Sequence, residues 1–150
     1  MIRLMEVDES NFEAVRRLEL KPDQHRFLDS PLGILARGYV YRAQRARVLA
    51  IMAEGESVGL LLVKDMDEEP ACYDLQQFMI DRRFQGRGYG AAALGLLLGI
   101  LRQERKYDDA EACVHRENAA ALALFRGAGF FDTGYVDPDV PDCLNLMCRL

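Results

Sequence analysis

The sequence lacks the paired cysteines and histidines that bind metal ions. None of its four cysteines lies in a C-x-x-C pair, and the two histidines, His25 and His115, are isolated from each other. Zinc sites need such pairs at close spacing. We therefore expect no metal site and no catalytic histidine, and we interpret the cysteines as small buried residues of strands.

Segments of membrane-inserting character are also missing. Residues 1–8 contain no apolar core of the kind found in signal peptides, and the longest apolar run, residues 89–101, is shorter than the roughly 20 residues that cross a bilayer. We expect a soluble cytoplasmic protein that has no membrane partner.

An excess of positive charge is not found either. The 19 basic residues are outnumbered by 24 acidic residues, which gives a net charge of -5. Nucleic acids are bound through basic surfaces, so we expect no nucleic acid partner. The acidic balance fits a cationic substrate, and it equally fits an ordinary soluble protein.

Length and composition predict a single domain over residues 1–150. Half of these residues are hydrophobic, which is enough for a packed core. Neither an internal repeat nor a linker interrupts the chain. The oligomeric state stays open, with a homodimer as one alternative.

The stretch from Tyr73 to Gly90 has the order strand, glycine-rich turn, helix. Leu75 and residues 78–80 are typical of a buried strand, and the turn at residues 85–90 precedes a long apolar helix. Glycines let a ligand approach the backbone, while the free N–H groups and the dipole of a helix N-terminus favour phosphate. Three arginines add positive charge at this turn, namely Arg82, Arg83 and Arg87.

The glycine spacing of this turn distinguishes between the known phosphate loops. A Rossmann turn requires G-x-G-x-x-G, which Gly86, Gly88 and Gly90 do not match, and the Gly-Lys-Ser/Thr of a Walker A loop is absent. The pattern Gln/Arg-x-x-Gly-x-Gly/Ala is matched fully by Gln85, Gly88 and Gly90. A plain glycine turn that caps a helix is the structural alternative.

Hydrophobic spacing and capping signals predict the other elements. Strands are expected over residues 2–7, 47–54, 58–63, 71–80, 110–114, 130–136 and 143–150. Helices are expected to start at a capping box of Ser10 and Glu13 and at Ser30 with Pro31, and to cover residues 91–101 and 118–128. Such an order predicts an α/β fold with a central mixed β-sheet flanked by helices on both faces.

The spacing also predicts which side chains face the core. The first helix should bury Phe12, Val15 and Leu18. The second helix should bury a face made of Leu32, Leu35, Ala36, Tyr39 and Val40. Small residues at Ala91, Gly95 and Gly99 should let the third helix approach the sheet closely. Residues 23–29 are either a substrate-facing loop or a plain connection between helices.

The loop, the order of the elements and two further blocks resemble the GCN5-related N-acetyltransferase (GNAT) family. The blocks are Val58-Gly59 after a Glu-Gly turn, and residues 118–130, with asparagine, small residues and a final Gly129-Phe130. This resemblance covers nearly the whole chain, and it implies the acyl-CoA N-acyltransferase fold with acetyl-CoA as cosubstrate.

The resemblance also implies which residues bind acetyl-CoA. The strand at Phe78, Met79 and Ile80 should pair with the pantetheine arm, because this strand splays from its neighbour in the family. The pyrophosphate should be held by backbone N–H groups of the turn, which comprises Gln85, Gly86, Arg87, Gly88, Tyr89, Gly90 and Ala91. Asn118 should lie near the cofactor arm, and it also suits a helix N-cap.

Phe125 departs from the family pattern. Most members carry a tyrosine there, whose hydroxyl protonates the departing thiolate, and phenylalanine has no such group. We expect Phe125 to pack near the cofactor sulfur. Direct attack of an amine on the thioester needs proximity, a neutral amine and an oxyanion donor rather than a protein nucleophile. Tyr73 and Asp74 are the candidate catalytic bases.

The resemblance predicts an N-acetyltransferase that acts on a primary amine. Residues 78–93 and the C-terminal end, residues 129–150, are most similar to the spermine/spermidine branch, so the partner expected is a small cationic amine such as a polyamine. Two alternatives stay open. One is an acetyltransferase for protein N-termini or lysines, and the other is a CoA-binding protein without catalysis.

Overall fold

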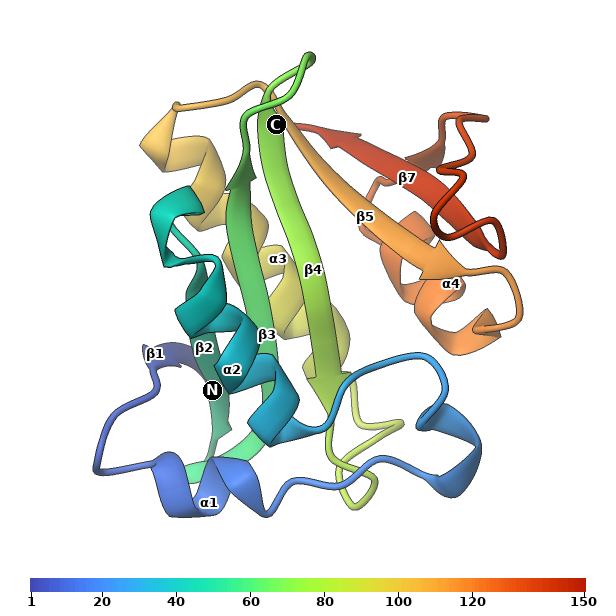
Figure 1. Cartoon of the computed structure of the whole chain (residues 1–150). Coiled ribbons are helices and arrows are strands. Elements are labelled where there is room, and N and C mark those ends of the chain that lie inside the picture. Colours follow the sequence, from blue (N-terminus) through green and yellow to red (C-terminus); the bar gives the residue numbers. More distant parts are fainter.

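The computed structural model describes residues 1–150 and contains a seven-stranded mixed sheet with helices on both faces (Figure 1). The strand order is β1-β2-β3-β4-β5-β7-β6, and only β4 and β5 are parallel neighbours. The strands are β1 Ile2–Glu6, β2 Arg47–Ala53, β3 Glu56–Met66, β4 Cys72–Ile80, β5 Asp109–His115, β6 Phe131–Asp132 and β7 Cys143–Arg149. The helices are α1 Phe12–Arg16, α2 Pro31–Val40, α3 Tyr89–Glu104 and α4 Ala119–Gly127, with 3-10 turns at Pro22–Gln24 and Arg42–Gln44. The predicted α/β architecture is therefore confirmed.

The sheet divides the core into two layers. On one face, α1 and α2 cover β2 and β3 through a smaller cluster that includes Val15, Ile34 and Met79. On the other face, α3 and α4 pack on a larger cluster that includes Leu94 and Leu146. Figure 1 shows α2 in front of the sheet and α3 behind it. The front of β5 and β7 carries no helix and is left open.

The hairpin between β2 and β3 forms as the Glu-Gly signal predicts. Glu54 and Gly55 both have positive φ, 51° and 79°, as a two-residue hairpin turn of the I′ type requires. β3 is longer than predicted and continues to Met66, because Lys64, Asp65 and Met66 pair with the first residues of β4.

Helix α1 begins differently from the prediction. The Ser10 hydroxyl donates to the Asp8 carboxylate at 2.6 Å, and the N-cap residue is Asn11, so the predicted capping box of Ser10 and Glu13 is wrong. Val15 is buried as expected, whereas Phe12 is 38% exposed. Leu18 is buried as predicted, although it lies beyond the end of this five-residue helix.

The start of α2 is predicted correctly, but its buried face is not. Ser30 caps the helix, because its hydroxyl accepts a hydrogen bond from the Gly33 N–H at 3.1 Å. Ile34 is the one fully buried residue of the helix, while Leu32, Tyr39 and Val40 are mostly exposed. Gly38 explains the rotation, since a Cβ there would lie 2.4 Å from Cγ2 of Val48 on β2. The helix turns its glycine towards the sheet, which the apolar spacing alone does not show.

The small residues of α3 also face away from their predicted position. A Cβ added at Gly95 or Gly99 would meet no atom within 4 Å, and Ala91 and Gly95 are exposed. The sheet is contacted instead by large side chains, among them Leu94, Leu97 and Leu101. The predicted close approach through the small-residue face is therefore wrong.

The centre of the sheet opens into a wedge. β4 and β5 pair only at Tyr73 with Ala110 and at Asp74 with Glu111, and then diverge towards the lower part of Figure 1. The register between β3 and β4 shifts at the same level, which leaves Gln76 as the extra residue of a β-bulge. The splayed strand that the family resemblance implies is thus present.

The C-terminal end forms less strand than predicted. β6 comprises only two residues, whereas β7 forms over nearly its whole predicted length. Leu146 and Cys148 point to the core as the alternation predicts, and Asn145 on the opposite face is also buried because it bonds Thr133.

Two features of the whole chain concern ions and membranes. The four cysteines are free thiols, and no group of three or more His, Cys, Asp or Glu side chains is arranged to hold a metal ion. None of the helices combines the length and the apolar character that a membrane crossing requires.

Candidate active site

A cavity of about 440 Å³ lies at the wide end of the wedge. Its walls come from the turn before α3, the end of β4, the start of α4 and the segment between α1 and α2. The lining residues that the sequence predicts are Phe78, Met79, Ile80, Gln85, Gly86, Gly88, Tyr89, Gly90, Ala91 and Asn118. The structure therefore brings most of the predicted cofactor-binding residues together around one hollow.

The turn before α3 is shaped to hold an anion. Gly86 and Gly88 have φ of 78° and 82°, and a Cβ at either position would meet nothing within 4 Å, so the backbone there is open to a ligand. The Ala92 N–H makes a bond of 3.1 Å to the Gly88 carbonyl, and the amides before it precede the helical ladder of α3. These features fit the pyrophosphate of CoA.

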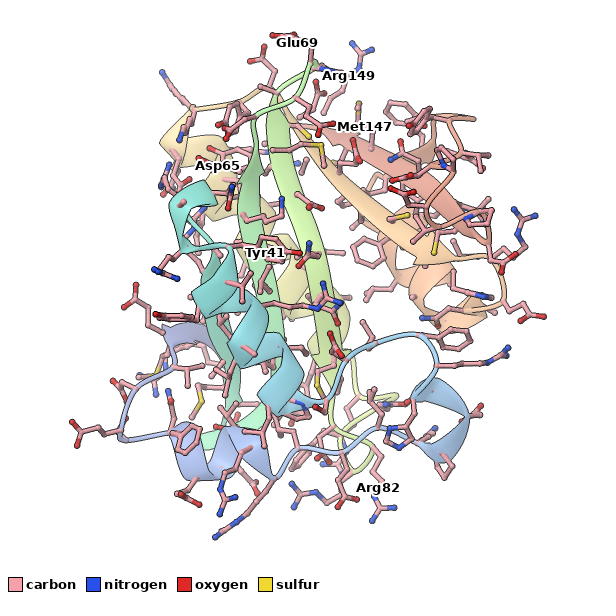
Figure 2. All side chains as sticks on the ribbon, in the orientation of Figure 1. Tyr41, Asp65, Glu69, Arg82, Met147 and Arg149 are labelled. Carbon is pink, nitrogen blue, oxygen red and sulfur yellow. The ribbon has the colours of Figure 1, made fainter.

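The arginines of this turn are mostly engaged elsewhere. Arg82 forms an ion pair with Glu19 at 3.2 Å, and Arg83 with Asp81 at 2.9 Å. Both line a second, polar hollow on the α1 side, and Arg82 lies beyond the lower end of β4 in Figure 2. Arg87 lies over the ring of Phe84, with 5.4 Å to the ring centre, and it does not line the cavity.

Gln85 holds the turn in place through its side chain. Its amide nitrogen donates to the Ile80 carbonyl at 2.9 Å and to Oε1 of Gln24 at 2.8 Å, while its own Oε1 accepts from Gln24 at 3.1 Å. The turn is thereby fastened both to the end of β4 and to the segment between α1 and α2.

The segment between α1 and α2 faces the cavity. Lys21, Gln24, Phe27 and Leu28 all line it, so residues 23–29 are more than a plain connection between helices. The segment is also fastened to the far side of the wedge, where Arg26 forms an ion pair with Glu117 at 2.6 Å. Sequence reasoning left this open, because the segment has no motif of its own.

A smaller slot of about 40 Å³ continues from this cavity into the wedge. Phe78, Gln76 and Phe125 line it together with residues of β5. Oε1 of Gln76 is buried and has no hydrogen-bond partner. A buried acceptor of this kind is costly unless a ligand satisfies it.

Phe125 packs among other aromatic rings at the slot. Its ring centre lies 6.1 Å from that of Phe78 and 5.1 Å from that of Phe130, both in edge-to-face geometry. The side chain is 5% exposed. Asn118, which lines both the slot and the cavity, caps α4 by accepting from the Ala121 N–H at 3.3 Å.

His115 also borders the slot, although the sequence singles out no role for it. Its Nδ1 accepts a hydrogen bond from the Glu117 N–H at 3.1 Å, and its ring lies 5.1 Å from that of Phe27. The contacts shown for His115 are structural.

The two candidate bases lie on opposite faces of β4. Tyr73 is fully buried against α3, where its hydroxyl contacts the Leu101 carbonyl at 3.5 Å and the Lys106 N–H at 3.3 Å. It lines neither the cavity nor the slot. The structure thus separates Tyr73 from the cavity and the slot, which argues against its predicted role as a base.

Asp74 faces the open front of the sheet. Its carboxylate lies 3.3 Å from the Lys64 ammonium, and its side chain is 13% exposed. Burial raises the pKa of Asp74 above its ordinary value, and Lys64 only partly offsets this effect. Asp74 itself lines neither the cavity nor the slot, but the next two residues of β4, Leu75 and Gln76, line the slot. An acid with a raised pKa is a better proton acceptor than an ordinary aspartate.

Glu111 is a second acidic residue beside Asp74, and the sequence analysis does not single it out. It pairs in register with Asp74 across the closed end of the wedge, on the same open face. Burial raises the pKa of Glu111, and the negative charges of Asp74 and Asp137 raise it further, against a hydrogen bond with Asn145 that lowers it. The sequence offers one signal for this residue, which is strand alternation. Glu111 lies between Ala110 and Ala112, which are buried in the core, so its side chain points to the other face of β5.

Solved structures of acetyltransferases share this fold. An aminoglycoside acetyltransferase, AAC(6')-Ib, in complex with coenzyme A has a TM-score of 0.79 at 14% identity, and the match covers 99% of this chain and 95% of that one. Spermidine N-acetyltransferase from Vibrio cholerae, in complex with CoA and spermine, has a TM-score of 0.76 at 15% identity, with coverage of 99% and 95%. The acetyltransferase of Salmonella typhimurium that modifies the N-terminal serine of ribosomal protein L7/L12 has a TM-score of 0.76 at 18% identity, with coverage of 99% and 95%.

At these identities the likeness establishes the fold and not the acceptor. Comparison with curated protein sequences gave no match. The sequence profile of the Acetyltransferase (GNAT) family, in contrast, matches residues 4–130. This match includes β4, the glycine turn and α4, which build the cavity. The chain is a member of the GNAT acetyltransferase family and uses acetyl-CoA as its cosubstrate.

Proposed function

We propose that this acetyltransferase acts on a primary amine of a small polycation such as spermidine or spermine. The observation that carries the proposal is the pair of carboxylates, Asp74 and Glu111, on the open sheet face, each one residue before a residue that lines the slot. Asp137, from the loop before β7, is close enough to affect Glu111. Such a group of carboxylates attracts ammonium groups and raises their local concentration.

The cofactor end of the site is assigned to the larger cavity. The amides of the turn at Gly86 to Ala91 bind the pyrophosphate, and the free edge of β4 at residues 78–80 pairs with the pantetheine arm. Acetyl-CoA, when bound, supplies a thioester that a neutral amine can attack directly. The wedge then holds the reacting groups next to the front face of the sheet.

The chain supplies positioning and proton transfer to the reaction. The carboxylate of Asp74 takes a proton from the incoming ammonium, directly or through water, which leaves the neutral amine that attack requires. As the C–N bond forms, the nitrogen loses its second proton to water, and the C–S bond breaks to release CoA as the thiolate. Oε1 of Gln76 accepts a hydrogen bond from the same nitrogen and thereby satisfies its buried lone pair. A backbone N–H of β4 near Phe78 or Met79 is the donor to the oxyanion.

The side chain of Phe125 has no proton to give to the departing thiolate. A thiol has an ordinary pKa of about 8.5, so the thiolate is a fairly good leaving group near neutral pH. General acid catalysis contributes roughly 10²- to 10⁴-fold to a rate, and we expect the rate lost here through the missing acid to be near the lower value. The role left to Phe125 is packing at the slot, where its ring meets that of Phe78.

The acceptor is tested with purified protein and a panel of amines, with release of free CoA as the readout. We expect spermidine to react faster than a monoamine of similar length, and we expect the difference to shrink at high ionic strength. Asp74→Asn should lower the rate of acetylation of spermidine and remove the preference for spermidine over the monoamine. Asp139→Asn, which removes the same charge from an exposed loop position, should retain them.

Equal rates on spermidine and the monoamine, or a preference for peptides, would remove the polyamine assignment. Release of no CoA with any amine or peptide, in a protein that still binds CoA, would contradict catalysis altogether.

A further inference from the structure

The cofactor cavity has one charged side chain in its lining, and that side chain comes from outside the glycine turn. Among the lining residues, Lys21 is the only one with a charge of either sign. The arginines next to the turn are paired with Glu19 and Asp81 or lie over Phe84. Arg87 has no acidic partner, but it does not line the cavity, and the amides of the turn provide partial charges only. Lys21 is therefore the one full positive charge in the cavity wall itself.

The backbone of Lys21 is held at a fixed place beside the turn. The Glu19 N–H donates to the Asp81 carboxylate at 2.9 Å, and the Glu19 carbonyl accepts from the Arg82 N–H at 2.8 Å. Asp81 is 1% exposed, and Leu20 is 7% exposed. These contacts fasten the chain immediately before Lys21 to the residues that open the turn.

Gln24 completes this attachment on the other side of Lys21. Its Oε1 accepts from the Lys21 N–H at 3.1 Å and from Nε2 of Gln85 at 2.8 Å. The backbone of Lys21 is therefore only two hydrogen bonds away from the turn. The Lys21 ammonium makes no ion pair and no hydrogen bond with the protein, so it is free to bind a ligand.

We propose that Lys21 binds the pyrophosphate of CoA from the cavity wall beside the glycine turn, with Gln24 as its positioning residue. An ammonium is a compact charge that suits phosphate oxygens, and its flexible stem needs a fixed backbone to act at one place. The inference rests on the use of acetyl-CoA by this family and not on the proposed acceptor.

The experiment measures binding by calorimetry with three ligands: CoA, dephospho-CoA, which keeps the pyrophosphate and lacks the 3′-phosphate, and phosphate-free pantetheine. Because the side chain is exposed, Lys21→Gln should weaken CoA and dephospho-CoA equally, by about fivefold at low salt. Pantetheine should bind this variant and the parent protein equally, and Lys21→Arg should retain most of the CoA affinity.

The matched control is Arg82→Gln, which removes the same charge from the other side of the turn. We expect it to leave CoA affinity unchanged, because Arg82 is paired with Glu19 and lines the other hollow. Unchanged CoA affinity in Lys21→Gln would overturn the proposal. A loss for CoA without a loss for dephospho-CoA would also overturn it, since it assigns Lys21 to the 3′-phosphate. Neither result depends on the acceptor amine, so these binding experiments can fail or succeed independently of the amine panel that tests the polyamine proposal.

Discussion

At the scale of single residues, position 125 distinguishes this chain from most of its family. Phe125 packs edge-to-face with Phe78 and Phe130 at the slot. Phe125→Tyr should bind acetyl-CoA normally and turn over at the parent rate or faster, because a hydroxyl there restores a proton donor. Phe125→Ala should weaken acetyl-CoA binding through lost packing, with a cost in stability of about 3–5 kcal/mol for a buried phenylalanine. Steady-state rates and CoA binding check both variants, and an inactive Phe125→Tyr that still binds acetyl-CoA would contradict this role.

Glu111 should show opposite effects on stability and function. The fold raises its pKa, so the group favours the folded state at low pH, where the carboxyl is protonated, and this contribution is lost as the pH rises through the raised pKa. Glu111→Gln should therefore increase the free energy of unfolding at pH 7, by less than about 1 kcal/mol at this partly exposed site. It should also raise KM for spermidine. Urea unfolding at pH 7 and pH 4 checks the first expectation, because the gain should shrink near pH 4; a variant less stable at pH 7 would contradict it.

At the scale of elements, the glycine turn can be tested by separating strain from charge. Gly88 has φ of 82°, so any other residue is strained there, although a Cβ would meet no atom within 4 Å. Gly88→Ala should cost about 1–2 kcal/mol of stability and weaken CoA binding mildly. Gly88→Asp adds a negative charge against phosphate and should abolish binding. Calorimetry on both folded variants gives the comparison, and normal CoA affinity in Gly88→Asp would exclude this turn as the phosphate site.

Local signals were sufficient to predict those elements that depend on local chemistry. Ser30 as an N-cap, the Glu54-Gly55 turn and the glycine loop each follow from a few adjacent residues, and all three are found in the structure. The buried face of α2 could not be predicted in the same way, because it depends on Gly38 meeting Val48 across the sheet. Propensity and spacing do not contain such tertiary contacts.

The same distinction applies to the site. The turn and Asn118 could be found from motifs, whereas Lys21, Gln24 and Glu111 could not. Lys21 and Gln24 reach the turn only through contacts between residues about 60 positions apart, such as the Gln24–Gln85 amide pair, for which the separation is 61. The sequence places Tyr73 on β4 beside Asp74, but strand alternation directs its side chain to α3, on the face opposite to Asp74.

At the scale of the whole molecule, two halves of the sheet are joined through a short seam. Only two residue pairs link β4 to β5, and below them the edge of β4 has no neighbouring strand. A ligand in the wedge would supply that missing partner. We expect CoA to slow amide hydrogen exchange most strongly at residues 75–80 of β4, relative to β1 and β2.

CoA should also raise the melting temperature. At a concentration of 100 times Kd, binding to the folded state alone adds about 2.7 kcal/mol, which for a chain of this size corresponds to roughly 5–10 °C. Calorimetric scans with and without CoA check this, with Gly88→Asp as the variant that should not respond. In the hydrogen-exchange experiment, slower exchange confined to β1 and β2 would contradict binding of CoA in the wedge.

The outward-facing glycines of α3 lower the thermal stability of the protein, and no packing contact requires them to be glycine. Gly95 and Gly99 lie within Tyr89–Glu104, and a Cβ at either would meet no atom within 4 Å. Each glycine in a helix costs about 0.5–1 kcal/mol relative to alanine, mainly through the greater freedom of the unfolded chain. Gly95→Ala with Gly99→Ala should therefore raise the melting temperature by roughly 2–8 °C while CoA affinity and turnover stay unchanged. A lower melting temperature would contradict this account of the two glycines.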